Sequence, residues 1–294
     1  MPIIINTSVS SLVAQNALTR ATWNLNRSLE RLSTGNRINS AADDPAGSYY
    51  AARLNAKIRG SNVAYQNVQA GNNMITAAAG DLESINDQLE RIKDLATQYS
   101  NDSLTEEQQK AIKKEVQQRV DEINRIAEES DFNDLKLLDG SRGSVRLQIG
   151  SESDAATNSL TVDDVFLNAS TGQDGIKLFG SGADQFADVE AAFKDADTAA
   201  KFIDIVQASA DTVTERISNA GIWQSRLSSI SDLLMTQNEN MASAYSTVMD
   251  TDIAAETANY TKNQLLQQTA SAMVSQANQI SGVLALKLVN AAVG

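Results

Sequence analysis

Hydrophobic residues recur at alternating intervals of three and four in five segments of the chain. This spacing places each series on one stripe of a helix, and its average of about 3.5 residues is typical of coiled-coil packing. The pattern predicts helices over about 6–33, 45–99, 105–129, 200–248 and 253–288. The two terminal series, which we predict to be packing seams, consist of Ala14, Leu18, Ala21, Leu25 and Leu32 at one end and of Leu266, Ala270, Met273, Ala277, Ile280 and Leu284 at the other.

Two of the predicted helix starts carry local signals. Asp44 is a favoured N-cap residue, and Pro45 follows it at the first helical position. Thr105 and Gln108 have the spacing of a capping box and follow a short polar loop. These signals indicate that separate helices begin directly after Asp44 and Thr105.

The central part of the chain has a different pattern. Val145, Leu147 and Ile149 alternate with polar residues, which indicates a strand, and Leu160 and Val162 supply a partner strand. We therefore predict a β-hairpin over about 144–162. Residues 168–185 are rich in Gly, Asp and Ser, which predicts an exposed loop, and a further short helix is expected within 187–200.

The amino-acid composition and the order of the predicted elements together indicate the fold class. Proline occurs only at positions 2 and 45, and aromatic residues make up 5% of the chain, so burial must come from aliphatic residues that suit helix–helix packing. The apolar stripes at the two ends are complementary. We predict a mostly α fold, a long antiparallel helical coiled-coil bundle with paired N- and C-terminal helices and a small β-hairpin insert.

The charge distribution narrows the classes of partner. The net charge of −13 argues against nucleic acid, because phosphate binding needs clustered Lys and Arg. Residues 1–44 and 250–294 are almost neutral, so the acidic excess lies between them. No segment approaches the roughly 18 apolar residues of a membrane span, and the first residues do not have the pattern of a cleavable secretory signal.

Residue types also bear on chemistry. The chain has no Cys and no His, which excludes disulfides and thiolate or imidazole metal sites, and no cofactor is expected. Asp43 and Asp44 are better explained as a helix cap and a polar linker than as a catalytic pair, because neighbouring carboxylates on a turn diverge. We therefore predict that the protein is not an enzyme.

Three long segments resemble the bacterial flagellins, in the order that this family has. They are LERLSTGNRINSAADDPAG (29–47), LTEEQQKAIKKEVQQRVDEINRIAEESDFNDLKLLDG (104–140) and DTDIAAETANYTKNQLLQQTASAMVSQANQISGVLALKL (250–288). The resemblance implies a subunit that self-assembles head to tail into the helical flagellar filament for swimming motility. It also implies an extracellular location in the bacterial flagellum, reached without a cleaved signal peptide. Pro45 and Asp134 stand where the family usually has Ala and Gly.

The resemblance further implies a division into domains. An inner, channel-lining helical domain would comprise 1–44 and 253–294, and an outer helical bundle would comprise 45–252 with a short variable insert at about 165–200. An inter-domain linker would join them, formed by Gly35, Asn36, Arg37, Asn39, Ser40, Asp43, Asp44 and Pro45.

Expected partners follow from the same resemblance. They are further copies of the chain, the flagellar export apparatus, an export chaperone that covers the C-terminal helix, and the hook-associated junction and cap proteins. The vertebrate toll-like receptor for flagellin would recognise Arg91, Leu95 and Glu115, which match a local segment of the family.

Two alternatives remain open on the sequence. A hook–filament junction protein shares the STG…DDP pattern, and Pro45 slightly favours it, whereas the second and third segments favour a filament subunit. A helical signalling or adaptor rod is a reading of another class, but it predicts no β segment at 144–162.

Overall fold

The computed structural model describes residues 9–101, 103–180 and 185–293, and for 280–282 and 284–293 it describes the backbone alone. The chain divides into two compact units, residues 1–56 with 240–294 (unit 1) and residues 57–239 (unit 2). Both divisions fall inside long helices rather than at the predicted limits of 44 and 253. The predicted functional division therefore stays a prediction.

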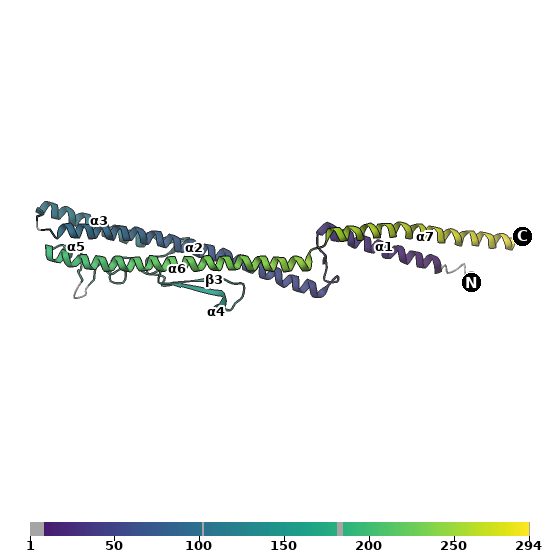
Figure 1. Cartoon of the computed structure of the whole chain (residues 1–294), viewed down its shortest axis with the longest axis horizontal. Helices are drawn as coiled ribbons and strands as arrows, with labels where there is room; N and C mark the ends of the chain where they lie inside the picture. Colours follow the sequence, from purple (N-terminus) through teal and green to yellow (C-terminus); the bar gives the residue numbers. More distant parts are fainter. Residues whose placement is uncertain (1–8, 102, 181–184, 294) are drawn as a thin grey trace. The chain divides into compact units, whose positions relative to one another are not determined.

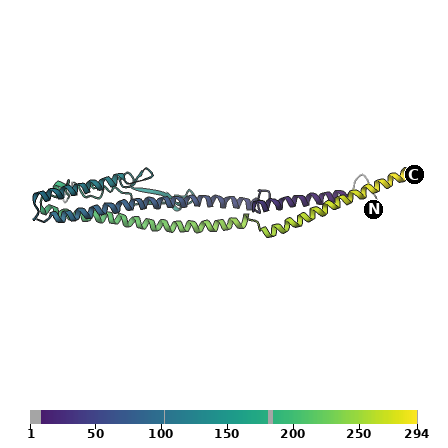
Figure 2. The ribbon, with the colours of Figure 1, turned by 90° about the horizontal axis from the view of Figure 1, so that it is seen from above.

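Unit 1 contains the pair of terminal helices, α1 (Val9–Thr34) and α7 (Ile253–Val293). They lie side by side in both views (Figures 1 and 2). Gly35 ends α1 in the left-handed region, with φ +73°, and its N–H donates to Arg31 O at 2.9 Å. Glycine is the usual residue at this position because a Cβ is disfavoured at positive φ.

Unit 2 is built on three long helices: α2 (Pro45–Tyr99, from residue 57 on), α3 (Glu106–Glu129) and α6 (Ala196–Met249, up to residue 239). Side-chain hydrogen bonds from Asn238 to Asn62 and from Gln69 to Ser231 show that α2 and α6 run antiparallel. The core between the helices includes the apolar stripes of α2 and α3 that show the three- and four-residue spacing, and all of their members are buried: Leu82, Ile85, Leu89, Ile92, Ala96 and Tyr99, and Ile112, Val116, Val120, Ile123 and Ala127.

Two small antiparallel sheets complete unit 2. The predicted hairpin is present as β3 (Ser144–Gln148) and β4 (Ser159–Asp163), with Val145 opposite Val162 and Leu147 opposite Leu160. The four-residue α4 (Ala155–Asn158) lies between these strands. A second hairpin, β1 (Asp131–Phe132) with β2 (Leu135–Lys136), was not predicted. Its turn residues Asn133 and Asp134 both have positive φ, of 52° and 62°.

The segment after β4 differs from the prediction of an exposed loop. Within the predicted range 168–185, Ala169 and Leu178 are 0% exposed and Ile176 is 2% exposed, and all three lie in the core of unit 2. The Tyr99 hydroxyl donates to Phe193 O at 2.6 Å beside the short α5 (Val189–Ala192), and Phe179 and Phe193 contact the Phe202 ring. Five of the six phenylalanines lie in 166–202, so this short insert is an integral part of the bundle.

The helix starts agree closely with the sequence signals. Asp44 Oδ1 accepts the Gly47 N–H at 3.0 Å, and α2 begins at Pro45. Thr105 and Gln108 form the predicted capping box, and α3 begins at Glu106. The predicted fold class is confirmed, since long helices pair at the two ends of the chain and a small antiparallel hairpin interrupts the bundle.

Candidate interaction surface

The contact between α1 and α7 is a regular but only half-buried seam. On α1 most residues that are not exposed form one series with alternating three- and four-residue spacing, which consists of the predicted Ala14, Leu18, Ala21, Leu25 and Leu32 together with Ser11 and Ser28. Thr22, Arg27 and Arg31 are partly buried beside this series. Most side chains of the series are small, which lets the two backbones approach closely. On α1, the predicted residues therefore lie on the partly buried face of the helix.

On α7 the prediction was wrong about the face. Leu266 and Met273 are 47% and 62% exposed and do not lie in the seam, whereas Ala270 and Ala277 do. The side chains of Ile280 and Leu284 lie outside the described residues. The observed seam on α7 contains Glu256, Tyr260, Asn263, Gln267, Ala270, Val274 and Ala277.

Polar side chains connect the two helices along this seam. Gln267 Nε2 donates to Thr22 Oγ1 at 3.2 Å, and Ser11 Oγ donates to Asn278 Oδ1 at 2.8 Å. Near the other end of α1, Arg31 Nη1 lies 3.7 Å from Glu256 Oε2. The sequence of α7 does contain this observed series, which also has three- and four-residue spacing. Because many of its members are polar, the hydrophobic pattern did not predict that it packs against α1.

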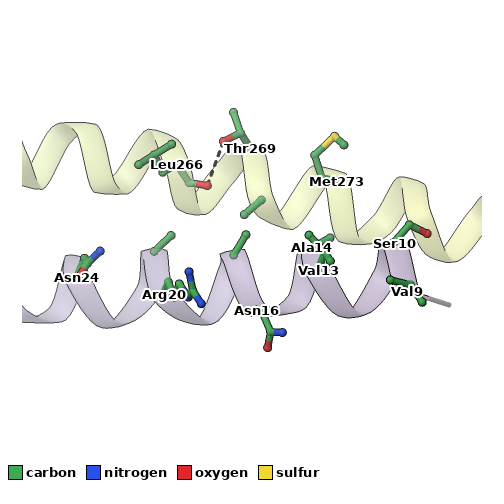
Figure 3. Close-up of a pocket in the computed structure, with 13 residues that line it drawn as sticks. Val9, Ser10, Val13, Ala14, Asn16, Arg20, Asn24, Leu266, Thr269 and Met273 are labelled. Carbon is green, nitrogen blue, oxygen red and sulfur yellow. Dashed lines mark hydrogen bonds between the residues drawn. The ribbon is translucent and has the colours of Figure 1, made fainter. Parts of the chain in front are cut away.

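An apolar groove runs along one side of the pair (Figure 3). Its volume is about 1060 Å³, and Val9, Val13 and Ala17 from α1 line it together with Leu266 and Met273 from α7. Figure 3 shows Met273 beside Val13 and Ala14, and Leu266 further along toward Asn24. The opposite side of the pair has a smaller groove, of about 680 Å³, lined mainly by polar residues of α7 such as Gln268, Ser271 and Ser275.

Large apolar side chains outside the groove are exposed as well. On α1 they include Leu12 at 59%, Trp23 at 62% and Leu29 at 53%, and on α7 they include Leu265 at 58%. Single exposed apolar residues are normal, but a continuous apolar surface on a paired helix is typical of an interaction site. The terminal pair thus presents to water the kind of surface that other proteins bury.

The predicted linker residues form an ordered connection. Asn36 pairs with Asp250 in an antiparallel bridge, and the Arg37 N–H donates to Met249 O at 2.6 Å while Arg37 Nη2 donates to Val248 O, also at 2.6 Å. Thr34 Oγ1 donates to Asn39 Oδ1 at 2.8 Å, and Thr251 N donates to Gly35 O at 2.9 Å. The two segments that join the terminal helices to α2 and α6 therefore bind each other.

Asp43 and Asp44 have separate partners in this connection. Asp43 Oδ2 accepts the Ser40 N–H at 3.1 Å, and Asp43 Oδ1 lies 2.7 Å from Arg27 Nη2. These donors, the Ser40 backbone first, lower the pKa of Asp43 below its usual value. Asp44 caps α2, as described above. The two carboxylates thus hold the turn and the helix start rather than facing a common point.

In unit 2 the three residues matched to a receptor site differ in exposure. Arg91 Nε and Nη2 donate to Glu115 Oε1 at 3.0 and 2.9 Å, and both side chains are partly exposed. Leu95 is only 2% exposed and belongs to the core. Its side chain supports α2 from inside, so a surface contact made by Leu95 itself does not agree with this structure.

In the part of the chain that the structure describes, no helix combines the length and apolarity needed to cross a membrane. This part of the chain also contains no group of three or more Asp and Glu side chains arranged to hold a metal ion.

Two regions of the chain match the descriptions of known protein families. Residues 5–142 match the family described as the bacterial flagellin N-terminal helical region, and residues 203–286 match the bacterial flagellin C-terminal helical region. The segment between them, which contains both strands of the β3–β4 hairpin and the buried insert, is matched by neither description.

Individual relatives match over almost their whole length. The chain is 32% identical over 291 residues to the flagellar filament 30.7 kDa core protein of Treponema maltophilum, covering 96% of this chain and 99% of the relative. It is 35% identical over 272 residues to a flagellin of Halalkalibacterium halodurans, covering 92% and 94%. With flagellin A of Vibrio cholerae the identity is 30% over 371 aligned positions, covering 95% and 98%. Because this last alignment is longer than the chain itself, that relative contains additional residues.

Proposed function

Since this chain belongs to the bacterial flagellin family, we infer that it is a structural subunit that self-assembles head to tail into the helical bacterial flagellar filament, which serves swimming motility. The relatives described above are a filament core protein and flagellins, and they favour this reading over a junction protein or a signalling rod. A head-to-tail contact whose rotation does not close generates an open helical polymer.

One observation carries the assembly mechanism, namely the exposed apolar surface of α1 and α7. In a single subunit, Val13, Leu266 and Met273 line a groove with no apolar neighbour on its open side among the described residues. Removing such surface from water is favourable by about 25 cal/mol per Å². Other subunits of the same filament would supply the missing neighbours, so that assembly completes the packing that the isolated pair lacks.

The domain division is proposed on the same basis. Residues 1–44 and 253–294 would form the inner, channel-lining part of the filament, and 45–252 the outer part. The support is the contrast between the almost neutral terminal segments, whose helices expose apolar residues along their pair, and the acidic remainder, which contains the extended buried core.

The exposed face of α7 also supports the predicted chaperone. An export chaperone that covers Leu265, Leu266 and Met273 before assembly would shield these exposed apolar side chains from non-productive contacts. The export apparatus and the hook-associated junction and cap proteins are proposed as partners on family resemblance alone.

For the innate receptor, the exposed pair Arg91–Glu115 supports recognition. Leu95 would contribute only by holding α2 in place, because its side chain is buried.

Electron microscopy of the purified chain with filament seeds tests the proposed function. We expect long filaments from the unchanged chain, whereas Met273→Asp, which places a charge in the apolar groove, should abolish elongation. Gln268→Asp is the matched control, since it adds the same charge to the polar side of α7. A short cap that never elongates would instead indicate a junction protein, and elongation by Met273→Asp would exclude the groove as an assembly surface.

A further inference from the structure

The seam between α1 and α7 contains a charged pair that is largely withdrawn from water. Glu256, in the first turn of α7, is 7% exposed, and its Oε2 lies 3.7 Å from Nη1 of Arg31. The Arg31 Nε is enclosed without a hydrogen-bond partner among the described residues. The Arg31 side chain is 23% exposed, so the carboxylate is the more deeply buried partner. A largely buried pair with incomplete hydrogen bonding is a poor source of stability, and the best-attested use of such groups is to specify how helices align.

The rest of the seam does little to define that alignment. Apolar members of the α1 series repeat at seven-residue intervals, as Ala14 and Ala21 do, and Ala270 and Ala277 repeat in the same way on α7. Sliding one helix along the other by a heptad would bring similar small residues together again. The packing of these small residues alone therefore distinguishes poorly between the native register and a slipped one.

The polar contacts do distinguish the registers. Going outward from the Arg31–Glu256 pair, Asn263 Nδ2 donates to Ser28 Oγ at 3.5 Å, and Gln267 donates to Thr22. In an antiparallel pair, a slip of one heptad that moves Glu256 toward the start of α1 would place it opposite Asn24, which carries no charge. The carboxylate would then be enclosed without its cation, which is strongly unfavourable.

We propose that Arg31 and Glu256, with Ser28 and Asn263 beside them, act as a register lock for the terminal helix pair. Its consequence rests on the proposed function. The apolar groove takes Val9 and Val13 from α1 and Met273 and Leu266 from α7, so the register decides which of these side chains lie opposite one another. The lock is therefore a set of positioning residues that align the surface by which subunits join.

A second restraint lies nearby and must be separated from the lock. The bridge between Asn36 and Asp250, with Arg37 N donating to Met249 O, ties the chain segments at the base of the pair. If these backbone contacts set the register alone, the charge on Glu256 would be irrelevant. Neutralising that charge while leaving the bridge unchanged discriminates between the two explanations.

Disulfide formation between two introduced cysteines reports the register of α1 and α7, because the chain contains no Cys of its own. Thr22→Cys with Gln267→Cys reports the native register, since these side chains are hydrogen-bonded at 3.2 Å. Thr22→Cys with Tyr260→Cys, or with Val274→Cys, reports a slip of one heptad in either direction. Seven residues displace the partner by about 10 Å along the axis at about 1.5 Å per residue, beyond the Cα separation of about 7 Å that a disulfide tolerates.

The full-length double-cysteine chains are assembled on filament seeds, sedimented and oxidised, with Glu256 intact or changed to Gln. With Glu256 intact we expect the native pair to cross-link almost alone. With Glu256→Gln the ratio of native to slipped cross-links should fall by about tenfold or more, because one partner of a buried pair has lost its charge. Glu30→Gln, an exposed neighbour of Arg31, is the matched control and should leave the ratio unchanged.

Each outcome decides the proposal. An unchanged ratio in Glu256→Gln filaments would overturn the lock and leave the backbone bridge as the cause of the register. Chains with intact Glu256 that fail to elongate seeds would contradict the proposed function instead. If Glu256→Gln chains do not elongate, the exchange Arg31→Glu with Glu256→Arg is used. Recovery of elongation then supports the lock, and no recovery contradicts it.

Discussion

Arg216 is a buried cation held by backbone oxygens. Its side chain on α6 leaves the residue 8% exposed, and Nη1 donates to Asn168 O at 2.7 Å and to Leu167 O at 3.4 Å. Burial lowers the pKa of Arg216 below its usual value because the charged form loses hydration. The guanidinium satisfies carbonyl groups at the start of the insert, and so it fixes this irregular segment to the helical bundle.

We expect Arg216→Ala to lower the free energy of unfolding by about 2–4 kcal/mol, because the carbonyl groups of Leu167 and Asn168 lose their donor and a space is left in the core. Urea denaturation followed by circular dichroism measures this. Arg226→Ala, an exposed arginine on the same helix, should change stability by less than about 1 kcal/mol. Equal effects of the two changes would show that Arg216 does not support the insert.

A substitution of Glu115 gives the most direct test of the proposed receptor contact. It accepts two hydrogen bonds from Arg91, and Arg119 Nη2 lies 3.6 Å from its Oε1. Glu115→Lys should lower receptor signalling by about tenfold or more, since it reverses the charge at the proposed contact. Folding should be little affected, because exposed ion pairs contribute at most about 1 kcal/mol.

Signalling by a cell line that carries the receptor, normalised to soluble monomer, is the measurement. Glu83→Lys, an exposed site elsewhere on α2, controls for the change in net charge. Unchanged signalling by Glu115→Lys would remove this residue from the proposed receptor site.

A glycine within the helix α2 allows a strand to pack closely against it. A Cβ at Gly71 would lie 2.3 Å from Leu147 Cδ1 and 3.3 Å from its Cγ, so the hairpin strand β3 approaches the helix where no side chain intervenes. Asn67 Nδ2 donates to Gln148 O at 3.1 Å one turn away. At Gly80, by contrast, a Cβ would have no neighbour within 4 Å.

These two positions give opposite expectations for the same substitution. Gly80→Ala should raise the free energy of unfolding by about 0.5–1 kcal/mol, because alanine has the higher helix propensity. Gly71→Ala should lose that gain or lower stability, because Leu147 must move, and it should reduce amide protection in 144–148. Chemical denaturation and hydrogen exchange measure both. Equal stabilisation by the two changes would contradict the close contact of hairpin and helix.

On the scale of the whole molecule, the two units differ in how completely they bury apolar residues. In unit 2 many core side chains, such as Leu82, Ile85 and Val213, are 0% exposed. Among the described side chains of the α1–α7 pair, only Ala21 and Ser28 of α1 and Glu256 of α7 are buried, and the seam is largely polar on the α7 side. An isolated pair of this kind is marginal in water, since most helix stability comes from tertiary packing.

We therefore expect Ala14–Leu32 and Leu266–Ala277 to exchange their amide protons rapidly in the free subunit and slowly in the filament. Residues 82–99 of α2 should be protected in both states and provide the internal control. Hydrogen exchange with mass spectrometry, on monomers and on sedimented filaments, measures this. Strong protection of the terminal segments in the monomer would show that the pair is stable without neighbours.

Local sequence patterns predicted most of the fold because their causes are local. Asp44–Pro45 and Thr105–Gln108 satisfy backbone donors within one turn, so the helix starts were readable from four residues. The β3–β4 hairpin followed from period-two alternation, and the stripes of α2 and α3 followed from their spacing. The β1–β2 hairpin was not predicted because Asp134 occupies a turn position with positive φ that is normally taken by Gly.

The amino-acid sequence by itself thus determined the helices, the hairpin and the pairing of the two chain ends. Only the tertiary structure decided which face of α7 meets α1. The helix α7 carries two overlapping series with three- and four-residue spacing, which share Ala270 and Ala277. Which of the two series packs against α1 depends on Arg31, Ser28 and Thr22, more than 200 positions away. It likewise decided that the insert is buried, since Phe166 and Leu178 follow no period and their partners come from distant helices. Contacts between residues far apart in sequence leave no local pattern, and so the polar seam, the apolar groove beside it and the buried insert had to be found in three dimensions.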